Sequence, residues 1–281
     1  MNALYMLSLG CTEHSVHLPI NVVLVTNEQD QQQLAYIPQG VYRIGSDVGA
    51  PDERPRHNVH LDDFYLGIYE VSNLQYATFL NDRQAKQSTV DTWIGLQNNI
   101  AKSSVISFTG ARYRTQYGYE DHPAIGISYE GAVQYCNWAN LRLPTEEEWE
   151  AAALGGRTSS LYPWGDASPE GKANYGQRWE SAIKAPPTKH VESFSANPYG
   201  LYNMIGNALE WTKSPYKPYQ EKILPEELRA SLEGRMVLRG GGFDSTEKEL
   251  HITYRRNYIQ RVRSYYTGGI GFRCAATEKP T

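Results

Sequence analysis

Regular hydrophobic periodicity is scarce in this 281-residue sequence, and that scarcity limits the folds it can adopt. Three segments, 72–82, 128–141 and 145–156, space their apolar residues as helices do. Short strand-like runs lie elsewhere, whereas 84–124 and 157–200 carry little periodicity. Loops of that length in a compact domain are usually functional, or held by an ion or a disulfide. We therefore expect one domain with few helices, short strands and much irregular structure.

Two of the three helical segments carry a capping box at their start. Ser72 and Gln75 have this spacing in the first, and Thr145 and Glu148 have it in the last. Acidic residues in the first turn of the last segment suit the helix dipole, and the Gly-Gly pair 155–156 ends it. These signals predict where both helices begin.

Composition argues against two classes of partner. The net charge is −4 and no long run of one sign occurs, so we expect no nucleic-acid binding. No apolar stretch approaches the ~20 residues of a membrane helix, so we expect no transmembrane segment.

Residues 1–30 are expected to form a tail or a leader remnant, and 31–281 a single domain. MNALYMLSLGCTEHS resembles the end of a secretory leader, with Gly10-Cys11 where a bacterial lipoprotein is cleaved and acylated. It lacks a basic n-region, and its apolar part is short. A lipid anchor at Cys11 and an unmodified cysteine in a terminal segment therefore both stay open.

Seven blocks resemble, in order, the formylglycine-generating enzyme family, also called the sulfatase-modifying factors. Together they run from residue 37 to about residue 277. They are IPQGVYRIGS (37–46), RPRHNVHLDDFYLGIYEVSNLQYATFL (54–80), HPAIGISYEGAVQYCNWANLRLPTEEEWEAAALGG (122–156), YPWGD (162–166), NPYGLYNMIGNALEWT (197–212), RGGGF (239–243) and GFRCA (271–275). The resemblance implies the family's variant of the C-type lectin fold, an α+β fold with little regular secondary structure.

The resemblance also implies a calcium site in GLYNMIGNALEW. Its ligands would be the Asn203 and Glu210 side chains with the Gly206 and Ala208 carbonyls. Calcium binds several oxygens of mixed carboxylate, amide and backbone origin. Spacing alone favours a Gly-Asn turn that leads into a β-segment, whereas the resemblance favours calcium.

A second calcium site of the family would use Asn174 and the Tyr175 carbonyl. Its remaining ligands fall in YGQRWESAIKAPPT (175–188), where this chain is shorter than the family. No acidic ligand can be assigned there.

Three cysteines occur, far apart in the sequence. The resemblance pairs Cys136 with Cys274 in a disulfide, whereas three unrelated thiols would suit a cytosolic chain. A disulfide implies an oxidising compartment. We therefore expect an exported bacterial protein, periplasmic or associated with the outer membrane, with a protein or peptide partner in the cell envelope.

The two copper-binding catalytic cysteines of the family have no counterpart here. When the number of residues from Gly240 to Cys274 is taken to be the same as in the family, the resemblance places the two cysteines at the positions of Ser245 and Leu250. A hydroxyl is a poor ligand for a soft metal and an isobutyl group is none. Thiolate chemistry needs a thiol, so we expect no copper and no formylglycine-generating oxidase activity.

Polar residues beyond the glycine turn leave an alternative site open. A carboxylate and a histidine in a groove would move a proton, and Asp244, Glu247 and His251 would also suit a hard metal. The interpretation we favour is a solvated loop whose charges face water. The candidates for the alternative site are Asp244, Glu247, His251, Tyr254 and Arg255.

Two functions are compatible with these observations. The favoured one is an exported, calcium-stabilised binding or regulatory module, a pseudoenzyme without copper oxidase activity. The alternative is an enzyme of different chemistry in the same groove, for example an accessory maturation or oxidation step on a peptide or siderophore-like substrate. Convergence of Asp244, Glu247 and His251 in a cleft would favour the enzyme, and exposure to solvent would favour the binding module.

Overall fold

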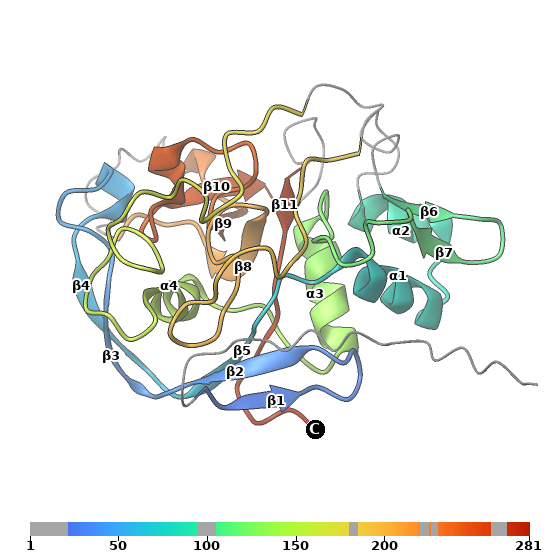
Figure 1. Cartoon of the computed structure of the whole chain (residues 1–281), viewed down its shortest axis with the longest axis horizontal. Coiled ribbons are helices and arrows are strands. Elements are labelled where there is room, and N and C mark those ends of the chain that lie inside the picture. The colour runs from blue at the N-terminus through green and yellow to red at the C-terminus, as the bar shows by residue number, and fades with distance from the viewer. Residues whose placement is uncertain (1–21, 95–104, 180–184, 220–224, 226–229, 260–268) are drawn as a thin grey trace, which may run out of the picture.

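Short helices and strands joined by long irregular segments make up the fold (Figure 1). The computed structural model describes residues 22–94, 105–179, 185–219, 225, 230–259 and 269–281. The expected α+β class with little regular secondary structure is confirmed. None of the helices in these described ranges is long and apolar enough to cross a membrane.

The three expected helices are present as α1 (Asn73–Asp82), α3 (Tyr129–Trp138) and α4 (Glu146–Leu154). Both capping boxes form. The Ser72 and Thr145 hydroxyls accept the N–H groups of Gln75 and Glu148, whose side chains accept the N–H groups of the caps. Gly155, with φ 58°, ends α4 in the left-handed conformation.

Segment 84–124 contains more regular structure than the sequence indicated. It holds α2 (Gln87–Trp93) and the antiparallel pair β6 (Ile106–Phe108) and β7 (Tyr113–Thr115). In α2 only Val90 is buried, so the seven residues carry no periodic apolar pattern. These elements form through tertiary packing, which local periodicity does not report.

The first sheet has the strand order β1-β2-β5-β12, and its pairs are antiparallel. Its strands are β1 (Leu24–Thr26), β2 (Gln33–Ile37), β5 (Phe64–Gly67) and β12 (Ala275–Ala276). Because β1 lies within the tail expected over 1–30, the ordered fold begins before residue 31. Residues 1–21, and Cys11 with them, lie outside the described part of the chain.

The second sheet places the two candidate segments beside each other. Its order is β10-β9-β8-β11, with β11 parallel to β8. Glu210 at the start of β8 pairs with Arg239 at the end of β9, so the segment before β8 meets the turn after β9. The strands are β8 (Leu209–Pro215), β9 (Arg235–Arg239), β10 (Arg256–Ile259) and β11 (Ile270–Gly271).

Smaller elements complete the described structure. They are the antiparallel pair β3 (Gly40–Ile44) and β4 (His57–Leu61), and the 3₁₀ helices Pro51–Glu53 and Glu247–Leu250.

Aromatic side chains from three parts of the chain form the core between α1 and α3. Tyr76 stacks on Tyr135 with ring centroids 5.8 Å apart, and Phe272 meets Tyr135 edge-on at 5.4 Å. A second core cluster surrounds the fully buried Trp149 of α4. Such rings stabilise through large buried area and specific geometry.

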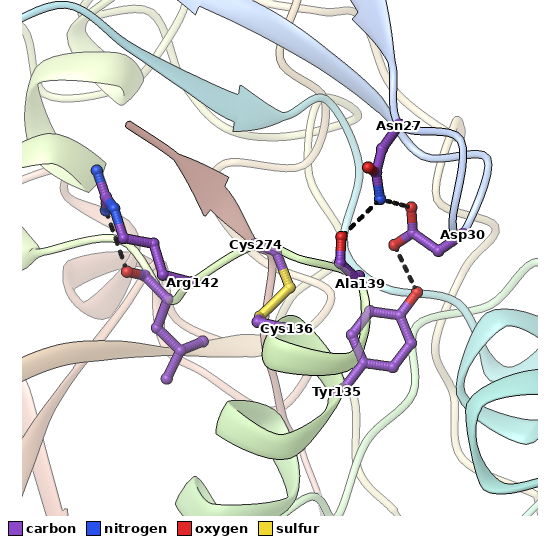
Figure 2. Close-up of a disulfide and its surroundings, with 8 residues drawn as sticks. Asn27, Asp30, Tyr135, Cys136, Ala139, Arg142 and Cys274 are labelled. Carbon is purple, nitrogen blue, oxygen red and sulfur yellow. Dashed lines mark hydrogen bonds between the residues drawn. A yellow bond between two sulfur atoms is a disulfide. The ribbon is translucent and has the colours of Figure 1, made fainter. Parts of the chain in front are cut away.

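The expected disulfide between Cys136 and Cys274 is present (Figure 2). It joins α3 to the segment that enters β12, across 138 residues of sequence. In the same view the turn between β1 and β2 is held to α3, because the Tyr135 hydroxyl donates to Asp30 Oδ2 at 2.9 Å. One covalent bond and several hydrogen bonds thus anchor the first sheet on α3.

Candidate functional site

A glycine turn follows β9 and touches the segment expected to bind calcium. Gly240 and Gly241 have φ values of 92° and 67°, in the left-handed region that favours glycine. The Gly206 N–H donates to the Gly240 carbonyl at 2.8 Å. The glycine turn after β9 and the segment expected to bind calcium are therefore adjacent.

Ser245 and Leu250 lie close together beside this turn. A Cβ on Gly241 would lie 3.3 Å from Ser245 Oγ and 3.0 Å from Leu250 Cδ2. Both side chains are buried. Ser245 Oγ accepts the Gly242 N–H at 3.0 Å, and Leu250 packs in the core cluster of Trp149. The positions that the resemblance assigns to thiols are thus neighbours, filled by a hydrogen-bonded hydroxyl and a core aliphatic group.

The acidic and histidine candidates on the loop do not form a metal cluster. Asp244 and Glu247 are exposed and His251 is half-buried. The Tyr162 hydroxyl donates to Glu247 Oε1 at 3.3 Å, and its ring lies 5.6 Å from the His251 ring. Glu247 and His251 therefore share Tyr162 as a neighbour. No group of three or more His, Cys, Asp and Glu within the described ranges is placed to hold a metal ion.

Tyr254 and Arg255 are engaged in other contacts. The Tyr254 hydroxyl donates to Glu249 at 3.0 Å, and burial together with Glu249 raises the pKa of Tyr254 to about 12. Arg255 is buried and donates from Nε and Nη2 to the two oxygens of Glu146, each at 2.7 Å. Its guanidinium lies 4.1 Å from the Tyr219 ring centroid. Arg255 thus holds the start of α4.

That contact belongs to a buried ion-pair network that the sequence did not reveal. Arg239 pairs with Glu150 and lies 3.7 Å from Glu146. Burial raises the pKa of Glu150, although Arg239 opposes the shift. Glu146 and Glu150 are four residues apart and share a helix face, where like charges destabilise the helix unless cations neutralise them. The acidic turn of α4 therefore binds two arginines in addition to facing the helix dipole.

Asn203 presents a free oxygen in the expected calcium segment. Its Oδ1 is buried and lacks a hydrogen-bond partner in the described structure. Its Nδ2 donates to Glu70 Oε2 and to the Val191 carbonyl, each at 3.0 Å. Leaving a buried acceptor unpaired costs about 1–3 kcal/mol, a cost that a bound cation would remove.

Glu210 is deeply buried and already hydrogen-bonded. Arg273 donates to its two oxygens at 2.8 Å each, and Trp149 Nε1 donates to Oε2 at 2.8 Å. A carboxylate has about four acceptor positions, so these donors leave room for a cation. With the Gly206 and Ala208 carbonyls, the available oxygens are the mixed set that calcium prefers. These residues supply the oxygen types that calcium prefers, and the calcium site stays a prediction.

Glu70, beside this segment, is a residue that sequence reasoning missed. It is 1% exposed and accepts the Nδ2 groups of Asn203 and Asn207, each at 3.0 Å. Burial raises the pKa of its carboxyl to about 8; Arg273 opposes the shift and Glu210 adds to it. The sequence around Glu70, which lies just before the α1 capping box, does not indicate that its carboxyl is buried beside Asn203 and Asn207.

The second calcium site stays a prediction. Asn174 Nδ2 donates to the Pro187 carbonyl at 2.9 Å and to Asn207 Oδ1 at 3.2 Å. The Tyr175 carbonyl accepts Gln177 Nε2 at 3.0 Å. Residues 180–184, within the segment expected to supply further ligands, lie outside the described ranges.

Two known proteins are similar to this chain in sequence. It is 34% identical over 248 residues to the serine/threonine-protein kinase pkn1 of Chlamydia caviae, covering 86% of this chain and 38% of that protein. It is 31% identical over 287 residues to the formylglycine-generating enzyme of Bos taurus, covering 87% of this chain and 75% of that one.

A solved structure shows the fold of this chain, and a family model shows its family. The structure of PvdO from Pseudomonas aeruginosa superposes with a TM-score of 0.64 at 20% identity, covering 90% of this chain and 97% of PvdO, which is a likeness of fold. The model of the sulfatase-modifying factor enzyme 1-like domain matches residues 22–278. With nearly the whole chain matched, this protein belongs to the sulfatase-modifying factor family, whose members include the formylglycine-generating enzymes.

Proposed function

We propose that this chain is an exported binding or regulatory protein, stabilised by calcium and without copper oxidase activity. The observation that supports the proposal is the pair Ser245 and Leu250, which lie together at Gly241 and occupy the positions that the resemblance assigns to the family's two thiols. Without thiols there is no soft ligand pair for Cu(I). The kinase name of the Chlamydia relative is not carried over, because this chain spans only 38% of that protein.

Titration with Cu(I) tests the loss of the copper site. A Cys11→Ser variant removes the cysteine outside the disulfide, so the oxidised chain keeps no free thiol that could bind Cu(I). We expect this variant to leave Cu(I) with a competing chromogenic chelator. Adding Ser245→Cys and Leu250→Cys should create one Cu(I) site per chain. Stoichiometric Cu(I) binding by Cys11→Ser alone would overturn the proposal.

Calcium is the proposed stabiliser, held by the Asn203 and Glu210 side chains with the Gly206 and Ala208 carbonyls. Its support is the buried Asn203 Oδ1 that lacks a partner among the described residues. The ion would supply positive charge to a region that contains two buried carboxylates, Glu70 and Glu210. Native mass spectrometry with and without a chelator should find one calcium per chain, or two if Asn174 and Tyr175 hold a second.

An enzyme of different chemistry is the second candidate, because Glu247 and His251 share Tyr162 as a neighbour. We place it second because Asp244 and Glu247 are exposed and Arg255 is engaged by Glu146. Open carboxylates lack the enclosed, convergent environment that tunes a general acid or base.

Export is proposed because the Cys136–Cys274 disulfide suits an oxidising compartment. We propose the periplasm or the outer membrane, with a lipid anchor at Cys11 as the means of attachment and a protein or peptide of the cell envelope as partner. Fractionation of cells that express the wild type or Cys11→Ser tests this. Equal release of both proteins with the soluble periplasmic fraction would contradict the anchor.

A further inference from the structure

A pocket of about 560 Å³ lies outside the sites described above, and we call it the Trp164 pocket. Its walls come from residues 163–164, 171–172 and 193–197 and from Tyr202. The volume is in the range of small-molecule sites, about 300–1,000 Å³. None of the described residues that line it belongs to 239–256, so the pocket is separate from the glycine turn.

Aromatic rings form the apolar wall of the pocket. Trp164 is half-buried, and its Nε1 donates to the Ala167 carbonyl at 2.9 Å, so the polar atom of the indole is already satisfied. Tyr162 stacks on this ring with centroids 5.4 Å apart. Phe194 is half-buried and Pro163 is buried, and both line the pocket. Such a wall takes up the apolar part of a ligand.

Tyr202 places an unpaired hydroxyl on the pocket. The residue is 7% exposed, and its ring packs on Tyr69 with centroids 5.0 Å apart. Its hydroxyl makes no hydrogen bond to the described residues, yet it is not sealed from solvent. Because Tyr202 lines the pocket, the open side of the hydroxyl faces the pocket. A tyrosine hydroxyl is protonated at neutral pH and can donate to an anion.

Lys172 supplies the charge of the pocket. No Asp or Glu among the described residues lines it, although the protein has a net charge of −4. The ammonium has no carboxylate partner in the described part of the chain, and its Nζ lies 5.6 Å from the centroid of the Trp164 ring. An exposed cation–π contact is weaker than a charge-assisted hydrogen bond, so a bound carboxylate would draw the ammonium from the ring. The pocket therefore attracts anions.

Two serines add further donors. Ser193 and Ser195 are exposed, line the pocket and make no side-chain hydrogen bond to the described residues. Asn197 also lines the pocket, but its carboxamide is engaged by the Ala152 carbonyl and the Tyr199 N–H. A carboxylate has about four acceptor positions, and hydroxyl groups rotate to donate to them. One cation among hydroxyl donors, next to an apolar wall, is complementary to a carboxylate with an apolar body.

We propose that the Trp164 pocket binds a carboxylate that carries an apolar body. Lys172 and Tyr202 receive the carboxylate, and the apolar body lies against Trp164 and Phe194. The C-terminal residue of a partner peptide and a free aromatic acid share this chemistry. The inference rests on the proposed binding function and names a surface and a ligand chemistry for it.

The test is calorimetric titration of the full chain with acetyl-Ala-Ala-Phe, which has a free C-terminal carboxylate, and with the same peptide as its C-terminal amide. The acid should bind about tenfold more tightly than the amide, because only the acid can pair with Lys172. This comparison uses the wild type and does not depend on the folding of a variant.

Substitutions then assign the binding to the pocket. Lys172→Met should weaken binding of the acid about fivefold, and Tyr202→Phe should weaken it about tenfold. Lys213→Met and Tyr117→Phe, at exposed positions outside the pocket, are the matched controls and should bind as wild type.

A second ligand, 3-phenylpropionate, separates the two sources of the carboxylate. Tighter binding of the peptide acid assigns the pocket to a peptide C-terminus, and equal or tighter binding of 3-phenylpropionate assigns it to a free acid. The inference is overturned if neither acid binds at millimolar concentration, if acid and amide bind equally, or if Lys172→Met and Tyr202→Phe both bind as wild type. None of these results depends on the Cu(I) titration. A chain that leaves Cu(I) with the chelator but binds neither acid would overturn the pocket and leave the proposed loss of oxidase activity standing.

Discussion

Removal of the Cys136–Cys274 disulfide should lower the free energy of unfolding by about 5 kcal/mol. The bond closes 138 residues of sequence. In the chain-entropy description, a loop of that length restricts the unfolded chain by about 17 cal/mol/K, which gives about 5 kcal/mol at 25 °C. Domains have total stabilities of only about 5–15 kcal/mol, so this bond decides whether the fold persists.

The replacement Cys136→Ala with Cys274→Ala also removes two buried sulfur atoms. Both cysteines are fully buried, so the alanines should cost about 1–2 kcal/mol more through lost packing. Reduced wild-type protein keeps the sulfur atoms and separates the two contributions. Equilibrium unfolding in urea, followed by tryptophan fluorescence with and without a reductant, gives each free energy.

Cys11→Ser serves as the control and should match wild type in both redox states. If the double alanine variant stays within about 1 kcal/mol of oxidised wild type with an unchanged m-value, the loop-closure reasoning is refuted.

Three further perturbations test buried groups. Calcium should raise the melting temperature of wild type, and Asn203→Leu should abolish that rise; an undiminished rise in differential scanning fluorimetry would exclude Asn203 as a ligand. With chelator present, Glu70 has a pKa of about 8 in the folded protein and about 4.5 in the unfolded chain. Its protonated carboxyl therefore stabilises the fold fully below pH 4.5, and this stabilisation is lost as the pH rises to 8. Urea unfolding at pH 5 and pH 8 should therefore show a smaller loss in Glu70→Gln than in wild type, and equal losses would contradict this. Arg255→Met should lower the free energy of unfolding by about 3–5 kcal/mol, because it leaves the buried Glu146 carboxylate without its arginine. Arg142→Met breaks the more exposed pair with Glu148 and should lower it by about 1 kcal/mol. Similar losses for both variants in chemical denaturation would argue against a buried pair.

Local signals predicted the parts of the fold that local chemistry determines. The caps Ser72 and Thr145 mark α1 and α4 because a helix start needs a nearby acceptor for its free N–H groups. The Cys136–Cys274 pairing was predicted from the resemblance of seven ordered blocks to the family, because spacing alone leaves cysteine pairing undetermined. The same resemblance predicted that the turn has no thiols.

Long-range contacts had no signature in the sequence. Arg255 meets Glu146 across 109 residues, and nothing near either residue announces the other. Gln32 sits in a run of three glutamines that is typical of solvated surface, yet the β1–β2 turn buries its carboxamide. Such environments arise from packing, and a one-dimensional pattern carries no record of them.

The segment that carries Arg273 and Cys274 sets the order in which a nascent chain can mature. Arg273 donates to the carbonyls of Gly67 and Ile68 from more than 200 residues away, and β12 completes the sheet at β5. Until residues 273–276 leave the ribosome, the Cys136 thiol and the edge of β5 that pairs with β12 lack their final partners, and Glu210 lacks Arg273. Contacts this distant form slowly, so the domain completes its fold only after residues 273–276 have been synthesised. During that interval, chaperones and thiol oxidants have access to the half-built domain.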